Sequence, residues 1–175
     1  MRRTFTLHSG FAAGLSAVVL SFVALTWLPG PSPVDGTGWA VPVILLAFLV
    51  LGTAVVPMAG TGSNARSRWS VFLRLPGRVK AVPGLLIALG VAMIIINAAG
   101  GEGALESPTA EGGRYFSYDQ STSPRVKVEL SRSQYEAVIE SQQRMMLAIA
   151  GLMSASAAGV VLAGGELRRQ DDAVG

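Results

Sequence analysis

The chain has 175 residues, of which 50% are hydrophobic and only 14% are charged, and its mean hydropathy is +0.47. A soluble domain carries about 25% charged residues, so this composition leaves too little charge to cover a water-soluble surface. The chain has no cysteine and a single histidine, His8, which excludes disulfides, thiolate nucleophiles and metal centres built from cysteine or histidine. We expect no catalytic residue, no metal and no cofactor.

Four blocks of the sequence, 11–28, 39–58, 81–100 and 145–164, contain no Asp, Glu, Lys, Arg or His. A helix rises 1.5 Å per residue, so about 20 residues cross a hydrocarbon core of about 30 Å. The rival interpretation, four buried helices of a soluble protein, would require polar outer faces, which these blocks lack. The pattern therefore predicts an all-α membrane protein, a four-helix transmembrane bundle.

The charges predict which side of the membrane each connection occupies. The segments 1–10, 59–80 and 165–175 hold nine basic and three acidic residues, whereas 29–38 and 101–144 hold five basic and eight acidic residues. Basic residues favour the cytoplasmic side, so we expect a multi-pass protein of the plasma membrane with both termini in the cytoplasm. The basic residues flank apolar blocks and do not form one soluble face, which argues against a nucleic-acid partner.

The first block also permits a second interpretation. Arg2 and Arg3 followed by an apolar stretch are typical of a signal peptide, and Arg-Arg-Thr-Phe is similar to a twin-arginine export pattern. The block is not followed by a good Ala-x-Ala cleavage site. Cleavage would leave three spans and the same topology for the rest of the chain.

Few polar side chains lie inside the blocks. Transporters usually place ionisable groups at membrane depth, and none is found here; the most polar side chain is Asn97, near the outer end of the third block. Asn97 is a candidate for binding a substrate, or for a hydrogen bond to another helix or to a lipid headgroup, and its depth favours the hydrogen bond. Small residues also recur every fourth position in the last block, which predicts a helix-packing stripe for this bundle or for a second chain: Gly151, Ala155, Gly159 and Ala163. Weaker runs of this kind begin at Gly10 and Gly84.

The basic loop 59–80 is predicted to contain a short helix. Trp69, Phe72 and Leu73 follow the spacing of one helical face, so their apolar side chains would enter the headgroup layer while the basic side chains bind anionic lipid. The predicted headgroup residues are Arg66, Arg68, Trp69, Arg74, Arg78 and Lys80. A specific protein partner for this loop is the alternative.

The segment 101–144 is the largest part predicted outside the membrane. Its composition predicts a mobile acidic linker up to Gly113 and then a β-hairpin formed by 114–119 and 125–130. A helix capped by Ser131 or Ser133 should run unbroken from about Arg132 through the last span. Glu136 and Glu140 are not expected to be acid–base catalysts, because Arg132 and Arg144 lie four residues to either side and form exposed ion pairs.

The aromatic side chains of this segment are the predicted outer contact surface: Tyr115, Phe116, Tyr118 and Tyr135. The order of Gly-Arg-Tyr-Phe, a hairpin, Leu-Ser-Arg-Ser-Gln-Tyr and Gln-Arg before a final span resembles a pattern in small multi-span bacterial membrane proteins of unknown role. The resemblance covers about 50 residues. It implies no activity and assigns no functional residue.

The chain is thus expected to have three parts: three transmembrane helices in 1–100 with the basic cytoplasmic loop 59–80, an extracytoplasmic linker, hairpin and helix in 101–144, and a fourth transmembrane helix with a cytoplasmic tail in 145–175. We expect a non-enzymatic protein that acts through contacts, as an accessory, assembly, sensing or immunity-type factor. Its expected partners are membrane lipids and a membrane protein or a second copy. The alternative is a subunit of a small-solute transporter or pore. A membrane enzyme is the third interpretation, and no nucleophile–base pair supports it.

Overall fold

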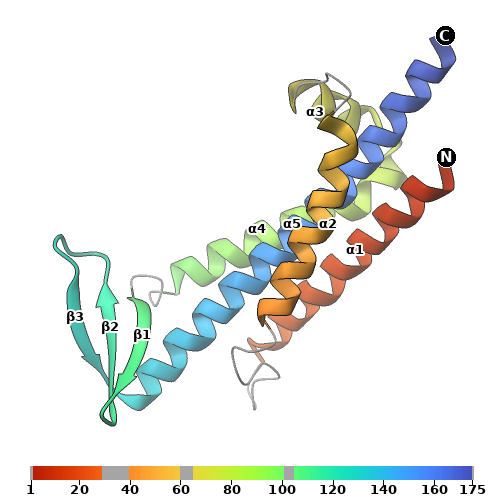
Figure 1. Cartoon of the computed structure of the whole chain (residues 1–175). Helices are drawn as coiled ribbons and strands as arrows, with labels where there is room; N and C mark the ends of the chain where they lie inside the picture. Colours follow the sequence, from red (N-terminus) through yellow and green to blue (C-terminus); the bar gives the residue numbers. More distant parts are fainter. Residues whose placement is uncertain (1, 29–39, 60–64, 101–104, 175) are drawn as a thin grey trace.

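A computed structural model describes residues 2–28, 40–59, 65–100 and 105–174. The fold is mostly helical with one small antiparallel sheet (Figure 1). In chain order the elements are α1 (Arg2–Leu25), α2 (Ala40–Ala59), α3 (Ala65–Arg74), α4 (Gly77–Ala99), β1 (Leu105–Glu111), β2 (Arg114–Asp119), β3 (Val126–Leu130) and α5 (Arg132–Val174).

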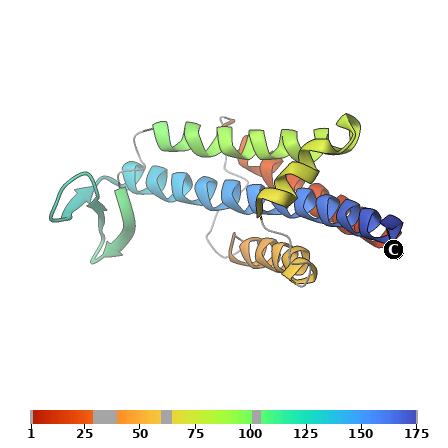
Figure 2. The same ribbon diagram turned by 90° about the horizontal axis from the view of Figure 1, so that it is seen from above.

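Helix α5 is the axis of the molecule. Its 43 residues span about 65 Å at 1.5 Å per residue, and α1, α2, α3 and α4 all pack against it. Helices α2 and α4 lie on opposite sides of α5 (Figure 2). Within the most apolar stretch of 18 residues in each helix, 56% of the residues are buried in α5 but only 17% in α4. The other helices are therefore held together mainly through α5.

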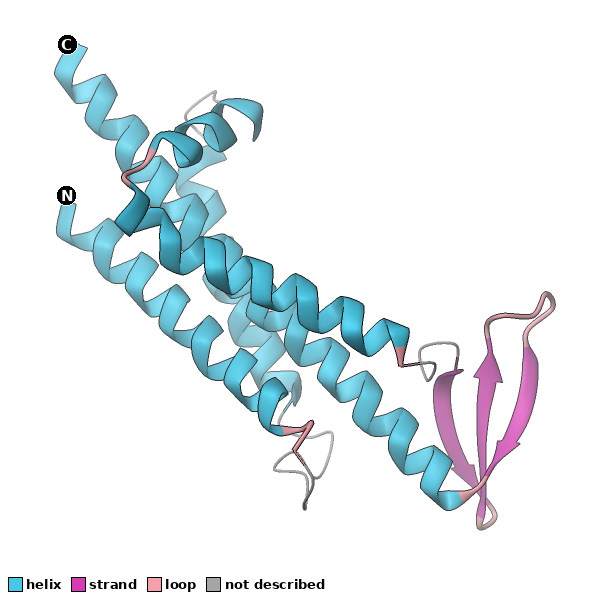
Figure 3. Cartoon of the chain, turned by 180° about the vertical axis from the view of Figure 1, so that it is seen from behind, coloured by secondary structure: helices cyan, strands magenta, loops and turns pink. Residues whose placement is uncertain are grey.

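The path of the chain separates the molecule into two ends. Both termini and α3 lie at one end, and the sheet lies at the other end of α5 (Figure 3). Helices α1 and α4 run away from the termini, and α2 and α5 return toward them. The predicted basic segments are thus grouped at one end and 105–144 at the other, whereas the expected outer segment 29–38 lies outside the described residues.

The core of the bundle is built on small side chains of α5. Because alanine and glycine let two helix backbones approach closely, hydroxyl groups of α1 reach carbonyl groups of α5. Ser16 Oγ donates to the Gly151 carbonyl at 2.8 Å, and Ser9 Oγ donates to the Ala158 carbonyl at 3.2 Å. Larger apolar residues of α1 fill the space around them: Val19, Leu20 and Val23.

Among the described residues, three helices are long and apolar enough to cross a membrane, with candidate stretches within Thr4–Leu25, Val79–Ala99 and Arg132–Leu167. The described apolar stretch of α2, Val41–Val55, is shorter. The first candidate stretch begins seven residues before the predicted block and so includes His8. The His8 ring Nε2 lies 3.4 Å from Thr53 Oγ1 of α2.

The sheet has three strands in the order β1-β2-β3, with both neighbouring pairs antiparallel. The predicted β-hairpin is confirmed as β2 and β3, but the prediction of a mobile linker up to Gly113 is wrong, because 105–111 forms β1. A two-residue turn joins β1 to β2: Gly112 and Gly113 have φ of 58° and 81°. Such hairpin turns favour glycine, which adopts positive φ without steric strain.

The predicted helix start is confirmed in detail. The Gln134 backbone N–H donates to Ser131 Oγ at 3.2 Å, and the Ser131 backbone N–H donates to Gln134 Oε1 at 2.9 Å. This reciprocal pair is a capping box, which satisfies N–H groups that lack a partner inside the helix. The helix then continues without a break from Arg132 to Val174, so the sheet and the bundle share one rigid support.

Candidate functional site

The inner face of the sheet rests on the first turns of α5. Tyr115 of β2 packs against Tyr135 of α5, with ring centroids 4.7 Å apart and planes inclined by 35°. Ser117, two residues further along the same face, is fully buried, and its Oγ donates to the Glu106 carbonyl of β1 at 2.8 Å. Val138, one turn beyond Tyr135, is also buried. These contacts fix the sheet to the helix.

The outer face of the sheet carries Phe116 and Tyr118 of β2, because successive side chains of a strand point to opposite faces. Lys127 Nζ lies 4.3 Å from the centroid of the Phe116 ring and forms an ion pair with Glu111 at 3.0 Å. A second ion pair on this face joins Arg114 and Glu129 at 3.7 Å. Tyr118 remains 38% exposed.

The four predicted contact residues therefore do not form one surface. Tyr115 and Tyr135 lie between sheet and helix, whereas Phe116 and Tyr118 are on the opposite face. The sequence contains the alternation that separates them, since Tyr115 and Phe116 are adjacent in a strand. Of the two faces of the sheet, the outer one is available for contact with another molecule.

The turn between β2 and β3 is organised by one carboxylate. Asp119 Oδ1 accepts hydrogen bonds from the Ser121 hydroxyl at 2.6 Å and from the Ser121 backbone N–H at 2.8 Å. These bonds stabilise the charged carboxylate, so they lower the pKa of Asp119 below its ordinary value. At the start of α5, the Glu136 carboxylate raises the pKa of Arg132. Both effects stabilise the charged forms of groups that face water.

The predicted small-residue stripe of α5 faces other elements of the same chain. A Cβ atom placed on Gly151 would lie 2.6 Å from Leu20 Cδ2 of α1, and one placed on Gly159 would lie 3.3 Å from the Phe72 ring of α3. Ala155 is fully buried, and Ala163 packs with α3. By contrast, a Cβ atom on Gly10, Gly14 or Gly84 would meet no described atom within 4 Å.

Helix α3 turns a different face inward from the one its spacing predicted. Val71, Phe72 and Leu75 are buried against the last third of α5, whereas Leu73 is exposed. The prediction that Phe72 and Leu73 share one lipid-facing side is therefore wrong, because α5 offers glycine and alanine positions where Phe72 packs. Lys80 Nζ donates to the Leu73 carbonyl at 2.6 Å and so caps the end of α3.

Of the predicted headgroup residues, Arg74 is exposed at the end of α3. Lys80 bonds to the Leu73 carbonyl. The side chains of four further headgroup residues lie outside what the structure describes: Arg66, Arg68, Trp69 and Arg78. The lipid-headgroup assignment of this loop stays a prediction.

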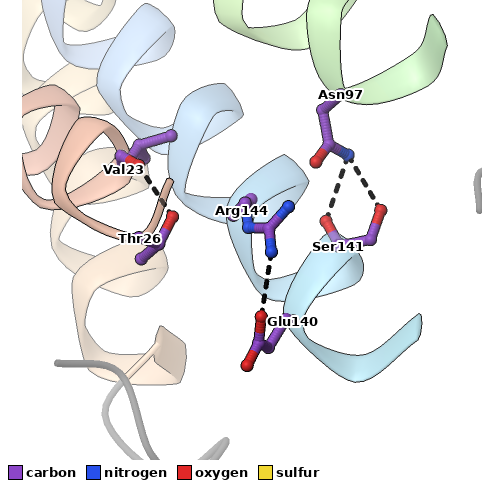
Figure 4. Close-up of polar contacts among 6 residues, drawn as sticks. All are labelled: Val23, Thr26, Asn97, Glu140, Ser141 and Arg144. Carbon is purple, nitrogen blue, oxygen red and sulfur yellow. Dashed lines mark hydrogen bonds and ion pairs between the residues drawn. The ribbon is translucent and has the colours of Figure 1, made fainter. Parts of the chain in front are cut away.

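Polar side chains lie where the ends of α1 and α4 that are remote from the chain termini approach α5 (Figure 4). Asn97 Nδ2 donates to the Ser141 carbonyl at 3.1 Å and to Ser141 Oγ at 3.2 Å, and both residues are buried. The Thr26 hydroxyl donates to the Val23 carbonyl at 2.7 Å and so closes the end of α1. Of the two hydrogen bonds expected for Asn97, to another helix or to a headgroup, the structure shows the bond to another helix.

The ion pairs of α5 differ from the expected exposed series. Arg132 and Glu136 do form an exposed pair at 2.8 Å. Arg144 Nη2 pairs with Glu140 Oε2 at 2.9 Å, but the Arg144 side chain is only 16% exposed. The prediction of an exposed pair at Arg144 is wrong, because this part of α5 packs against other helices. Asn97 of α4 bonds to Ser141 one turn before Arg144, and Val23 of α1 shares a core cluster with Leu147. Residue spacing alone does not report such packing.

The site is therefore a small sheet fixed to the first turns of α5, and the outer face of this sheet is free. A buried polar cluster, formed by Asn97 and Ser141, lies where α4 ends against α5. Among the described residues, no group of three His, Asp or Glu side chains is placed to hold a metal ion. Comparison of the chain with protein-family models, curated proteins and solved structures finds no match.

Proposed function

We propose that the chain is a four-span protein of the plasma membrane with both termini in the cytoplasm, and that it acts by contact through the outer face of its sheet. The end of the molecule that carries the termini and α3 is formed by the described parts of the segments 1–10, 59–80 and 165–175 (Figure 3). Together these segments have a net charge of +6, from nine basic and three acidic residues. The segments that we propose to lie outside, 29–38 and 101–144, have a net charge of −3, from five basic and eight acidic residues. Of these, 105–144 forms the sheet end of the structure. The positive end would face the cytoplasm.

The observation that carries the contact role is the continuity of α5, which supports the sheet at one end and forms the centre of the bundle. A partner held on Phe116 and Tyr118 would be rigidly connected to every helix. The proposed role is accessory, assembly, sensing or immunity-type, with a membrane protein or a second copy as partner. Lipids surround the exposed apolar side chains of α1, α2 and α4.

A photocrosslinking amino acid at Tyr118 tests this role in native membranes. We expect it to give one discrete adduct, because Tyr118 lies on the free face, and we expect the same probe at Ser133, beside the cap of α5, to give none. If both positions yield the same adducts, or neither yields any, the sheet is not a specific contact surface.

The alternative is a subunit of a small-solute transporter or pore. The buried polar side chains of the described bundle are serine, asparagine and glutamine, without a charged residue, which favours the contact role. We expect no solute flux from the purified protein in liposomes. Flux that requires Asn97 would favour the alternative.

A further inference from the structure

Two arginine–glutamate pairs on α5 have the same spacing but different surroundings. Arg132 is 77% exposed, and its Nε donates to Glu136. Arg144 is 16% exposed, donates to Glu140 through Nη2 and leaves its buried Nε without an acceptor among the described residues. A guanidinium has five N–H donors, and Glu140 takes up only part of them. Since Nε is closed off, the donors of Arg144 that an outside acceptor can reach are those that Glu140 leaves unused on Nη1 and Nη2.

The depth of Arg144 shows which acceptors can approach. It is the last charged residue before 145–165, an uncharged stretch of 21 residues that is followed by Glu166. This stretch measures about 32 Å as a helix, close to the hydrocarbon thickness of about 30 Å. In the proposed membrane placement, Arg144 lies at the outer hydrocarbon boundary, from which its long side chain reaches the phosphate groups of the headgroup layer.

The neighbouring polar groups are occupied by other bonds. Asn97 donates to Ser141, and the hydroxyl of Thr26 donates to the Val23 carbonyl (Figure 4). Glu140 is 45% exposed and holds one edge of the guanidinium in place. Trp27, just beyond α1, is partly exposed, as is typical of an aromatic residue at the membrane interface.

We propose that Arg144 binds the phosphate of an outer-leaflet phospholipid at the junction of α1, α4 and α5. The planar guanidinium presents paired donors that match two phosphate oxygens, and Glu140 acts as a positioning residue. The inference rests on the proposed membrane placement and not on the contact role of the sheet. It concerns the outer leaflet, opposite the basic loop 59–80.

The test is a thermal-unfolding titration of the detergent-purified full chain with dioleoylphosphatidylglycerol. We expect the lipid to raise the unfolding midpoint, and we expect Arg144→Gln to weaken the apparent affinity about tenfold or more, since a hydrogen-bonded charge pair is lost. Arg144→Lys, which keeps the charge but lacks the fork, should bind with intermediate affinity. Arg132→Gln, the matched control, should bind like the parent.

Three outcomes would overturn the proposal. The first is that dioleoylglycerol, which has the same acyl chains without phosphate, raises the unfolding midpoint of the parent equally, which would mean that only the chains are bound. The second is that inorganic phosphate alone raises the midpoint equally, which would mean that the ligand is a free anion. Equal affinity of the parent, Arg144→Gln and Arg144→Lys would exclude Arg144. None of these results affects the four-span topology, which cysteine labelling tests separately.

Discussion

The substitution Ala137→Pro should separate the motion of the sheet from that of the bundle. Ala137 lies in the part of α5 that extends between the capping box and Ser141, where α4 makes its last hydrogen bond. A proline here removes a backbone hydrogen bond and clashes with the preceding turn, at a cost of about 3 kcal/mol or more. We expect α5 to kink or break at this point while the bundle remains folded.

The measurement is the distance between spin labels on cysteines placed at Ser121 and Ala98, which the cysteine-free chain allows. Both positions are exposed, one in the β2–β3 turn and one at the end of α4. The parent should give a narrow distance distribution and Ala137→Pro a broad one. Arg132→Pro is the matched control, because Arg132 is the first helical residue and proline is tolerated there. An unchanged distribution in Ala137→Pro would show that α5 is not the connection.

The substitution Gly151→Val should destabilise the bundle by about 1–3 kcal/mol, the usual cost of overpacking a filled core. The added Cβ would lie 2.6 Å from Leu20 Cδ2 and 2.8 Å from Leu20 Cγ. Leu20 is 1% exposed and packs in the buried cluster between α1 and α5. The Leu20 side chain or helix α1 must therefore shift, and a shift of α1 away from α5 would also weaken the bond from Ser16 to the Gly151 carbonyl.

Gly14→Val is the matched control, since it makes the same change in α1 at a position with nothing within 4 Å. Unfolding by sodium dodecyl sulfate, followed by circular dichroism, should show a lower midpoint for Gly151→Val and little change for Gly14→Val. Leu20→Ala should partly restore the stability of Gly151→Val. Equal midpoints for the two valine variants would mean that the stripe does not pack against α1.

Local patterns predicted those elements whose determinants are close together in the sequence. The apolar blocks, the alternation of 126–130 and the pair Ser131 and Gln134 each specify their structure through neighbours a few residues away. The capping box is the clearest case, because both hydrogen bonds join residues three positions apart.

Strand β1 could not be recognised from its composition. It contains Pro108 and a left-handed residue, Ser107 with φ of 54°, at an irregularity in the pairing with β2, and such residues are depleted in strands. Pairing with β2 and the bond from Ser117 to Glu106 stabilise it. The available signal was Gly112-Gly113, a glycine pair of the kind that forms two-residue hairpin turns.

The burial of Arg144 and the inward face of α3 were also beyond local reasoning. Both depend on which helices pack against α5 and at what height: α1 and α4 near Arg144, and α3 near Gly159, where Phe72 packs. Helical spacing shows which residues share a face but not which face another helix covers.

The central claim is that the sheet and the basic loop lie on opposite sides of a membrane. Single cysteines at Ser121, in the β2–β3 turn, and at Ser63, between α2 and α3 in the sequence, can be reacted with a membrane-impermeant maleimide in intact cells. The account predicts labelling at Ser121 without permeabilisation and at Ser63 only after it. Labelling at Ser63 but not at Ser121 in intact cells would contradict the topology and the role of the sheet as an outer contact surface.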